Sequence, residues 1–197
     1  MHPPTFFLAL LLAFPLVPFA AAVRAADDDA TRDAWEAVAR GDAAALMRHA
    51  LAPGTGDPAG FDVDDCTTQR NLSDAGRAQA RTIGAHVARA LGTREVDVYS
   101  SAWCRCLETG RLLGLGEVRA LTPLNSFFQA RESAEAQTEA LRRWIDERLA
   151  SAEPAPAILV THQVNVTALT GGFAASGEIV IVDVDDTVLA RIRIDAE

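Results

Sequence analysis

One pattern, repeated three times, most constrains the fold: a short strand-like run that ends abruptly in polar side chains. The first run, residues 43–47, is apolar and ends in Arg48-His49, and a segment rich in glycine and proline follows at once. A short apolar run bounded by such turn-forming residues indicates a buried strand. Two later runs end in Ser100-Ser101 and in Thr161-His162. Ligands of open α/β sheets bind beyond the carboxyl ends of the strands, so these polar residues are candidates for a site.

The segments between these runs have the composition and spacing of helices. Strands and helices alternate from residue 43 to residue 169, which predicts an α/β fold with a mainly parallel sheet. Because such a sheet is covered on both faces, we expect a three-layer α/β/α sandwich in one domain, residues 27–197. The predicted helices cover residues 29–40, 73–91, 103–113, 133–150 and 165–169, and a weaker strand at 118–121 and a terminal hairpin of 179–184 and 187–194 complete the pattern.

The first 26 residues differ from the rest of the chain. Residues 6–17 are almost wholly apolar, and small residues dominate 20–26. This is the pattern of a secretory signal peptide, and it predicts a periplasmic or secreted protein with no membrane association after cleavage. The segment before the apolar stretch has no Lys or Arg, so an uncleaved anchor is the alternative, although the short apolar length and the prolines disfavour it.

The charge of the chain bears on its partners. The formal net charge is −9 at pH 7. An acidic surface disfavours nucleic acid and anionic membranes as partners. It does not disfavour a small anionic substrate, because arginines gathered in a cleft invert the field locally.

The cysteines are Cys66, Cys104 and Cys106. In an exported protein an odd number of cysteines predicts one disulfide and one free thiol. Cys104 and Cys106 lie two apart at a predicted helix start, where their side chains point away from each other. We therefore expect Cys66 to pair with Cys104 or with Cys106. The spacing matches no zinc pattern, so no metal is predicted.

The polar ends of the three strands predict a chemistry. If the strands are neighbours, Arg48, His49, Arg105 and His162 form a compact cationic pocket at one edge of the sheet. Arginine side chains bind phosphate oxygens bidentately. One imidazole in such a pocket can attack phosphorus in line while the second stabilises the transferring group. The expected ligand is a small phosphorylated substrate, and the reaction needs no metal and no cofactor.

Four segments, in order, resemble signatures of the histidine phosphatase superfamily, which includes the cofactor-dependent phosphoglycerate mutases and acid phosphatases. They are Leu46-Met47-Arg48-His49, residues 72–80, residues 100–109 and Val160-Thr161-His162. The resemblance implies a phosphoglycerate mutase-like fold and a phosphatase in which His49 is the nucleophile and forms a phosphohistidine. By position it also implies that Arg48, Arg105 and His162 hold the phosphoryl oxygens, and that Arg70 and Ser100 line the pocket.

The sequence departs from this family at two points. Ala50 stands where a glycine usually follows the catalytic histidine, which requires ordinary backbone angles there. The second departure concerns the acid that protonates the leaving oxygen. The mutase-like glutamate is absent after the third strand, and Gln163 stands where acid phosphatases have an aspartate. The remaining candidates are Glu132 and the loop carboxylates Asp57, Asp62, Asp64 and Asp65, and the missing acid leaves an alternative, a non-enzymatic phosphate-binding protein of the same fold.

Overall fold

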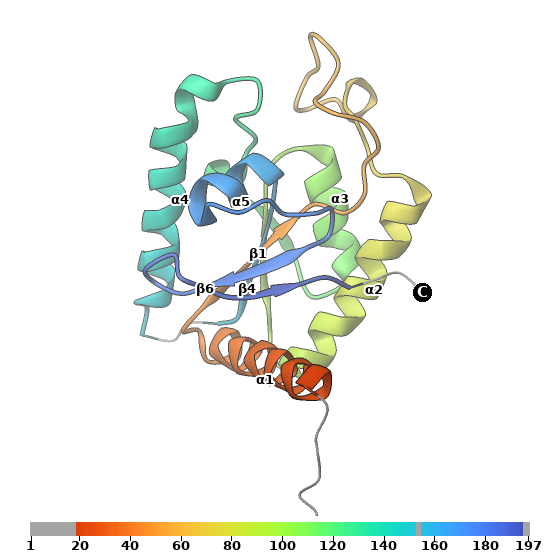
Figure 1. The fold of residues 1–197 in the computed structure, drawn as a ribbon. Helices are drawn as coiled ribbons and strands as arrows, with labels where there is room; N and C mark the ends of the chain where they lie inside the picture. The colour runs from red at the N-terminus through yellow and green to blue at the C-terminus, as the bar shows by residue number, and fades with distance from the viewer. Residues whose placement is uncertain (1–18, 153–154, 195–197) are drawn as a thin grey trace, which may run out of the picture.

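Four parallel strands and an antiparallel hairpin form one six-stranded sheet (Figure 1). The computed structural model describes residues 19–152 and 155–194. The strands are β1 (Ala44–Arg48), β2 (Asp97–Ser100), β3 (Val118–Ala120), β4 (Ala157–Thr161), β5 (Ile179–Val182) and β6 (Val188–Ile192). Their order in the sheet is β3-β2-β4-β1-β5-β6, with the hairpin at one edge. The mainly parallel sheet confirms the predicted fold class.

Helices cover both faces of this sheet and complete the predicted three layers (Figure 1). They are α1 (Phe19–Arg40), α2 (Asp74–Leu91), α3 (Cys104–Leu113), α4 (Ala134–Leu149) and α5 (Gln163–Thr170), with short 3-10 helices η1 (Cys66–Thr68), η2 (Thr122–Leu124) and η3 (Arg131–Ser133). Successive side chains of a strand point to opposite faces. Ala45 and Met47 of β1 therefore pack in the cluster that α1, α2 and α3 share, and Ala44 and Leu46 pack with α4 and α5.

Two helices begin earlier than predicted. α1 begins at Phe19 rather than at residue 29, so its backbone includes the last residues of the predicted signal peptide. The rest of that peptide, residues 1–18, lies outside the described residues. α5 begins at Gln163, directly after His162, whose backbone is still extended. α2 begins close to the predicted residue 73, and Ser73 caps it, because the Ser73 hydroxyl accepts the N–H of Gly76 at 3.1 Å.

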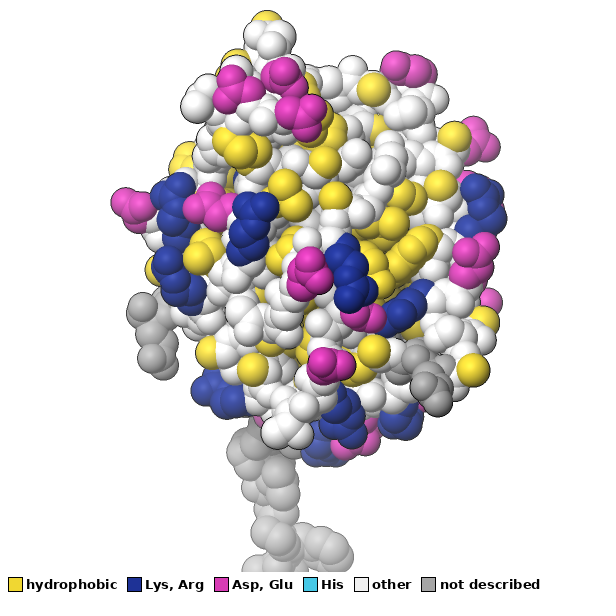
Figure 2. Space-filling model, turned by 180° about the vertical axis from the view of Figure 1, so that it is seen from behind, with side chains coloured by type: hydrophobic (Ala, Val, Ile, Leu, Met, Phe, Trp, Pro, Cys, Tyr) yellow, Lys and Arg dark blue, Asp and Glu magenta, His cyan; other side chains and the backbone are white. Residues whose placement is uncertain are grey.

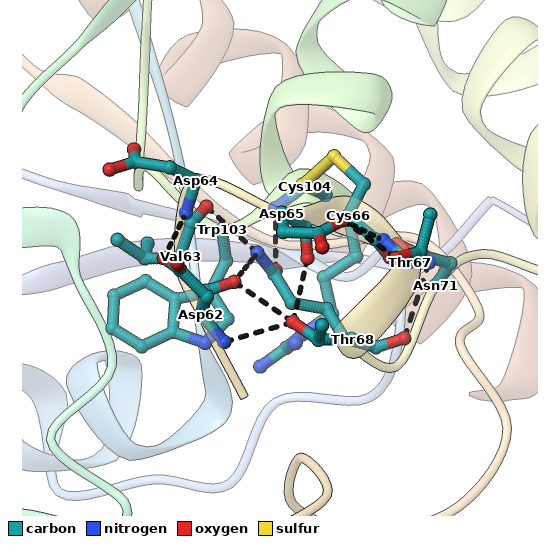
Figure 3. The surroundings of a disulfide bond; sticks show 12 residues. Asp62, Val63, Asp64, Asp65, Cys66, Thr67, Thr68, Asn71, Trp103 and Cys104 are labelled. Atoms are coloured by element: carbon teal, nitrogen blue, oxygen red, sulfur yellow. Dashed lines mark hydrogen bonds between the residues drawn. A yellow bond between two sulfur atoms is a disulfide. The ribbon is translucent and has the colours of Figure 1, made fainter. Parts of the chain in front are cut away.

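A long loop, residues 49–73, connects β1 to α2 and lies at the end of the molecule where the parallel strands finish (Figure 1). A disulfide between Cys66 and Cys104 ties this loop to the start of α3, with Cα atoms 5.6 Å apart (Figure 3). The predicted disulfide is thereby confirmed. The partner of Cys66 is Cys104, and Cys106 is a buried free thiol. Gln69 adds a second tie, because its side chain accepts the N–H of Cys104 at 3.0 Å and donates to two loop carbonyls.

The surface seen from behind carries charges of both signs between hydrophobic side chains (Figure 2). Acidic side chains gather at its top, the end of the molecule at which the long loop lies in Figure 1. Asp62, Asp64 and Asp65 of that loop are at least partly exposed. Within the described ranges, no helix is long and apolar enough to cross a membrane.

Candidate active site

The carboxyl ends of β1, β4 and β2 meet at one edge of the sheet because these strands are neighbours. Arg48 lies opposite Thr161, and Ser100 lies opposite Val160. The residues that follow the strands therefore come together, and a cavity of about 320 Å³ lies among them. Six of the candidate residues named from the sequence line this cavity: Arg48, His49, Asp57, Arg70, Arg105 and His162.

His49 follows β1 and is 2% exposed. Its Nδ1 lies 2.8 Å from the carbonyl oxygen of Ala50. A carbonyl only accepts hydrogen bonds, so the ring carries its proton on Nδ1 and has a lone pair on Nε2. Burial, with the nearby charges of Arg105 and Arg48, lowers the pKa of His49 to about 3. The imidazole is therefore neutral at ordinary pH, and its Nε2 is an available nucleophile.

Ala50 replaces the usual glycine without backbone strain. In the described part of the chain, Asp186 is the only non-glycine residue with a positive φ, so Ala50 has ordinary backbone angles. Its methyl group is fully buried in a small cluster with Ala52 and Leu72. The first departure from the family pattern therefore leaves the backbone beside His49 in a normal conformation.

His162 follows β4, and its proton is also placed by its neighbours. Its Nδ1 lies 3.3 Å from Nη2 of Arg105, which can only donate, and its Nε2 lies 2.8 Å from the hydroxyl of Ser101. His162 therefore donates from Nε2 to Ser101. Burial, followed by the charges of His49 and Arg105, lowers the pKa of His162 well below its ordinary value. Its ring centroid lies 5.5 Å from that of His49.

Three arginines surround the two imidazoles. Arg105 of α3 is 2% exposed. Nη1 of Arg48 donates to the carbonyl of Ala174 at 2.9 Å, and Nε of Arg70 donates to that of Gly56 at 2.8 Å. Burial and the charge of Arg105 lower the pKa of both Arg48 and Arg70. These cations are thus held close together against their repulsion, and an anion bound among them would relieve it.

Two predicted site residues do not reach the cavity. The Ser100 side chain is fully buried and donates to the carbonyl of Ser101 at 2.8 Å. The next residue, Ser101, contacts His162 instead. Glu132 lies in η3 and lines a separate surface cavity beside Glu135 of α4. The structure therefore leaves Glu132 apart from the two histidines.

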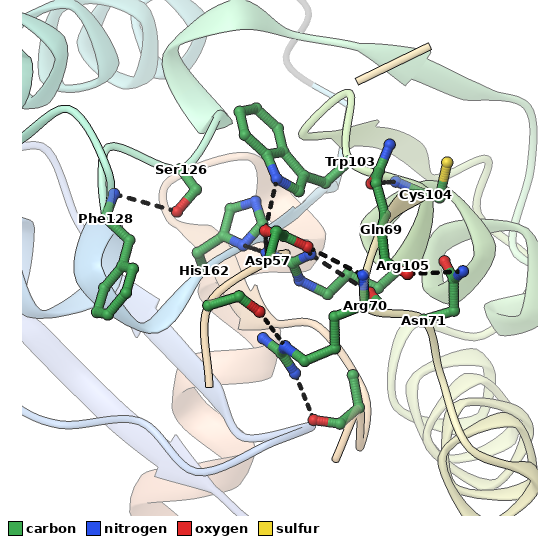
Figure 4. Close-up of polar contacts among 12 residues, drawn as sticks. Asp57, Gln69, Arg70, Asn71, Trp103, Cys104, Arg105, Ser126, Phe128 and His162 are labelled. Atoms are coloured by element: carbon green, nitrogen blue, oxygen red, sulfur yellow. Dashed lines mark hydrogen bonds and ion pairs between the residues drawn. The ribbon is translucent and has the colours of Figure 1, made fainter. Parts of the chain in front are cut away.

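Asp57 of the long loop is the one carboxylate among the described residues that line the main cavity, and Figure 4 shows its polar contacts. Its two oxygens accept from Nη1 and Nη2 of Arg105 at 2.7 and 3.1 Å. The indole N–H of Trp103 and the backbone N–H of Arg70 donate to it as well, each at 3.1 Å. Burial opposes its ionisation, but the hydrogen bonds and charge of Arg105 outweigh burial and lower the pKa of Asp57.

Aromatic side chains form much of the remaining wall of the cavity. Phe61, Trp103 and Phe128 all line it. Trp103 packs its ring 5.7 Å from that of Phe61 and 5.5 Å from that of His162, measured between centroids. The one sequence signal for Trp103 is its place directly before the helix that carries Arg105. The cavity thus combines a cationic floor with flat apolar walls, a combination suited to an anionic ligand with an apolar part.

The sheet and its covering helices define a fold. A mainly parallel central sheet with helices on both faces, in this strand order, is the phosphoglycerate mutase-like fold, and this chain has that fold. Solved structures of histidine phosphatases share it. By contrast, no protein-family model and no curated protein matches the sequence.

Three solved structures illustrate the likeness. TTHB049 from Thermus thermophilus is 19% identical, with a TM-score of 0.53, over 77% of this chain and 99% of that one. The protein histidine phosphatase SixA, in complex with tungstate, is 14% identical, with a TM-score of 0.52, over 76% and 96%. Mycobacterial glucosyl-3-phosphoglycerate phosphatase, in complex with VO3, is 16% identical, with a TM-score of 0.52, over 72% and 92%. Identities this low establish the fold alone, so the activity is argued from the site.

Proposed function

We propose that this chain is an exported phosphatase that hydrolyses phosphomonoesters, without a metal ion, through a phosphohistidine on His49. The observation that carries the proposal is the hydrogen bond from Nδ1 of His49 to Ala50, which leaves Nε2 unprotonated in a cavity lined by Arg48, Arg105 and His162. A neutral imidazole of fixed tautomer among cations has both the nucleophile and the charge complement that phosphoryl transfer requires.

The reaction has two displacements at phosphorus. In the first, the Nε2 lone pair of His49 forms a bond to phosphorus, and the bond to the leaving oxygen breaks with its electron pair on oxygen. In the second, a water oxygen attacks phosphorus, and the phosphorus–nitrogen bond breaks with its pair returned to Nε2. The guanidinium groups of Arg48 and Arg105 offset the charge on the transferring phosphoryl group in both steps.

Two of the similar proteins support the reaction class. SixA is described as a protein histidine phosphatase, and the mycobacterial protein as a glucosyl-3-phosphoglycerate phosphatase. Their structures hold tungstate and VO3, respectively. For this chain we propose a small phosphorylated substrate, because the cavity of about 320 Å³ is small and partly apolar.

Export is supported by two independent features. The apolar N-terminal segment has the pattern of a signal peptide. The Cys66–Cys104 disulfide is of a kind that persists in oxidising compartments such as the periplasm.

The test is hydrolysis of p-nitrophenyl phosphate by the purified chain, with and without EDTA. We expect activity that survives the chelator and is lost in His49→Ala, whereas His86→Ala, a matched change on α2 outside the cavity, retains it. An acid-labile phosphoprotein should form in the wild type and not in His49→Ala. Activity that EDTA removes, or that His49→Ala keeps, contradicts the proposal. Phosphate binding with no turnover would instead support the phosphate-binding protein.

A further inference from the structure

The proposed reaction needs Arg105 to bind the phosphoryl group, but in this structure Arg105 is bonded to the carboxylate of Asp57. Arg105 is the most deeply buried of the three cavity arginines, and both of its terminal nitrogens are bonded to Asp57 (Figure 4). A guanidinium fork binds a carboxylate and a phosphate in the same paired geometry. The side chains of Arg105 and Asp57 are 2% and 6% exposed, so little of this pair is open to water. A phosphoryl group that binds the Arg105 fork must therefore displace Asp57.

The histidines of the site cannot supply a proton to the leaving oxygen. His49 donates its ring proton to the carbonyl of Ala50, and its other nitrogen is the nucleophile. His162 donates its proton to Ser101. The thiol of Cys106 is fully buried beneath His162, and burial raises its pKa to about 12. Among the described residues of the cavity wall, this leaves Asp57 as the one carboxylate that can act as an acid.

We propose that Asp57 is the general acid of the reaction and that the bound phosphoryl group prepares it by displacing it from Arg105. The inference rests on the proposed phosphatase function and names the proton donor that the first displacement of that reaction needs. Every group now bonded to the Asp57 carboxylate, namely Arg105, the N–H of Arg70 and the indole of Trp103, favours its ionised form. A phosphoryl dianion in the Arg105 fork replaces this cationic partner with a like charge, and a carboxylate beside a like charge takes up a proton.

The protons balance over the cycle. Asp57 takes one proton from water when substrate binds. In the first displacement it gives that proton to the leaving oxygen as the bond from Nε2 of His49 to phosphorus forms and the ester bond breaks. In the second displacement its carboxylate removes a proton from the attacking water, while the phosphorus–nitrogen bond breaks. Phosphate leaves, and Asp57 either keeps this proton for the next substrate or releases it to solvent and returns to Arg105 as a carboxylate.

The test compares two substrates that differ in the quality of the leaving group. A general acid matters most for a poor leaving group. Asp57→Asn should therefore lower kcat/KM, which reports the first displacement alone, for phenyl phosphate by about 100-fold, at the lower end of the usual range for general acids, and change kcat/KM for p-nitrophenyl phosphate far less. Asp57→Glu should restore part of the phenyl phosphate activity. Asp64→Asn, an exposed carboxylate of the same loop, should leave both rates as they are.

Other outcomes overturn the proposal. An equal fall in the values for both substrates would show that Asp57 only positions Arg105. A rise in both would show that Asp57 only blocks the binding of phosphate to Arg105. If Asp57→Asn does not fold, the wild type still decides, because proton donation requires a normal solvent deuterium isotope effect on kcat/KM for phenyl phosphate, and its absence overturns the proposal. If the wild type hydrolyses neither substrate, or does so without His49, the phosphatase function itself fails and this proposal falls with it.

Discussion

The hydroxyl of Thr109 joins the helix of Arg105 to Ala50, the residue that follows His49. It accepts the backbone N–H of Ala50 at 3.1 Å and donates to the carbonyl of Arg105, one turn earlier on α3, at 2.6 Å. Thr109 and Ala50 are both fully buried. The positions of His49 and Arg105, which come from separate segments of the chain, are therefore linked through one buried side chain.

Removal of this hydroxyl should affect both stability and activity. Thr109→Val keeps the shape but leaves the buried N–H of Ala50 without a partner, which should cost about 1–3 kcal/mol of unfolding free energy. Because His49 and Arg105, the proposed catalytic groups, lose this link and shift slightly, kcat/KM should fall by about 10-fold or more. Urea unfolding and p-nitrophenyl phosphate kinetics check both. Thr109→Ser keeps the hydroxyl and should retain more activity than the valine variant; the reverse order would contradict the link.

The buried neutral histidines predict a loss of stability in mild acid. In the unfolded chain a histidine titrates near pH 6.5, whereas the pKa of folded His49 is about 3. Between these values the unfolded state binds more protons, so the free energy of unfolding rises with pH. His49 alone should therefore remove about 2 kcal/mol as the pH falls from 7 to 5, and His162, shifted in the same direction, should add to this.

The pH range of this measurement separates histidines from carboxylates. Asp57 and Glu178 also have lowered pKa values, but their ordinary values are near 4, so they contribute below pH 5. Urea unfolding at pH 7 and pH 5 should show a smaller difference in His49→Gln than in the wild type. His86 is only half-buried, and burial lowers its pKa too, so His86→Gln should reduce the difference in unfolding free energy between pH 7 and pH 5 less than His49→Gln does. Equal pH dependence in wild type and His49→Gln would contradict the prediction.

The sequence indicated the strand ends because that signal is local. An apolar run followed by polar residues marks Arg48-His49 and Thr161-His162 without knowledge of the fold, and the sheet then brings them together. The local sequence does not show whether Ser100 or Ser101 faces the site. Both serines are fully buried, but side chains alternate along a strand, so a shift of one residue at the end of β2 decides which serine contacts His162.

The part of the site that could not be predicted comes from the long loop. Asp57 was one of four loop carboxylates, and no periodicity distinguishes it from Asp62 or Asp64. Its contact with Arg105 depends on the path of the loop, which is fixed by distant partners such as Cys104. The partner of Cys66 could not be predicted for the same reason. The spacing of Cys104 and Cys106 shows that their side chains point in different directions, but it does not show which of them faces the loop.

Replacement of Gly76 by alanine should destabilise the fold, although a change from glycine to alanine usually stabilises a helix. In an exposed helix, alanine is more stable than glycine by about 1 kcal/mol. A Cβ at Gly76, however, would lie 2.0 Å from the carbonyl oxygen of Leu51, where α2 meets the long loop. Gly76→Ala should therefore cost about 3 kcal/mol in urea unfolding. Ala78→Gly, at a more accessible position of the same helix, should cost only about 1 kcal/mol, and a stabilised Gly76→Ala would contradict the packing.

The disulfide should stabilise both the fold and the position of Asp57. Cys66 and Cys104 are 38 residues apart, and closing a loop of this length in the unfolded chain is worth about 4 kcal/mol in the chain-entropy description. For a domain of this size, loss of that amount lowers Tm by roughly 10 °C. The double variant Cys66→Ser, Cys104→Ser should show this decrease in a thermal melt.

The same variant should also lose activity, because the free loop no longer keeps Asp57, the proposed acid, at the wall of the cavity. A reducing agent provides the control. It should lower Tm and kcat/KM of the wild type to those of the double variant and change neither value in the variant itself, since the remaining thiol, Cys106, is buried and outside the bridge. A wild type that is insensitive to reduction while its disulfide is shown to be open would mean that Gln69 and the other loop contacts hold the loop without the bridge. In that case Asp57 would keep its place, and the leaving-group comparison of Asp57→Asn should give the same result in reducing and oxidising buffer.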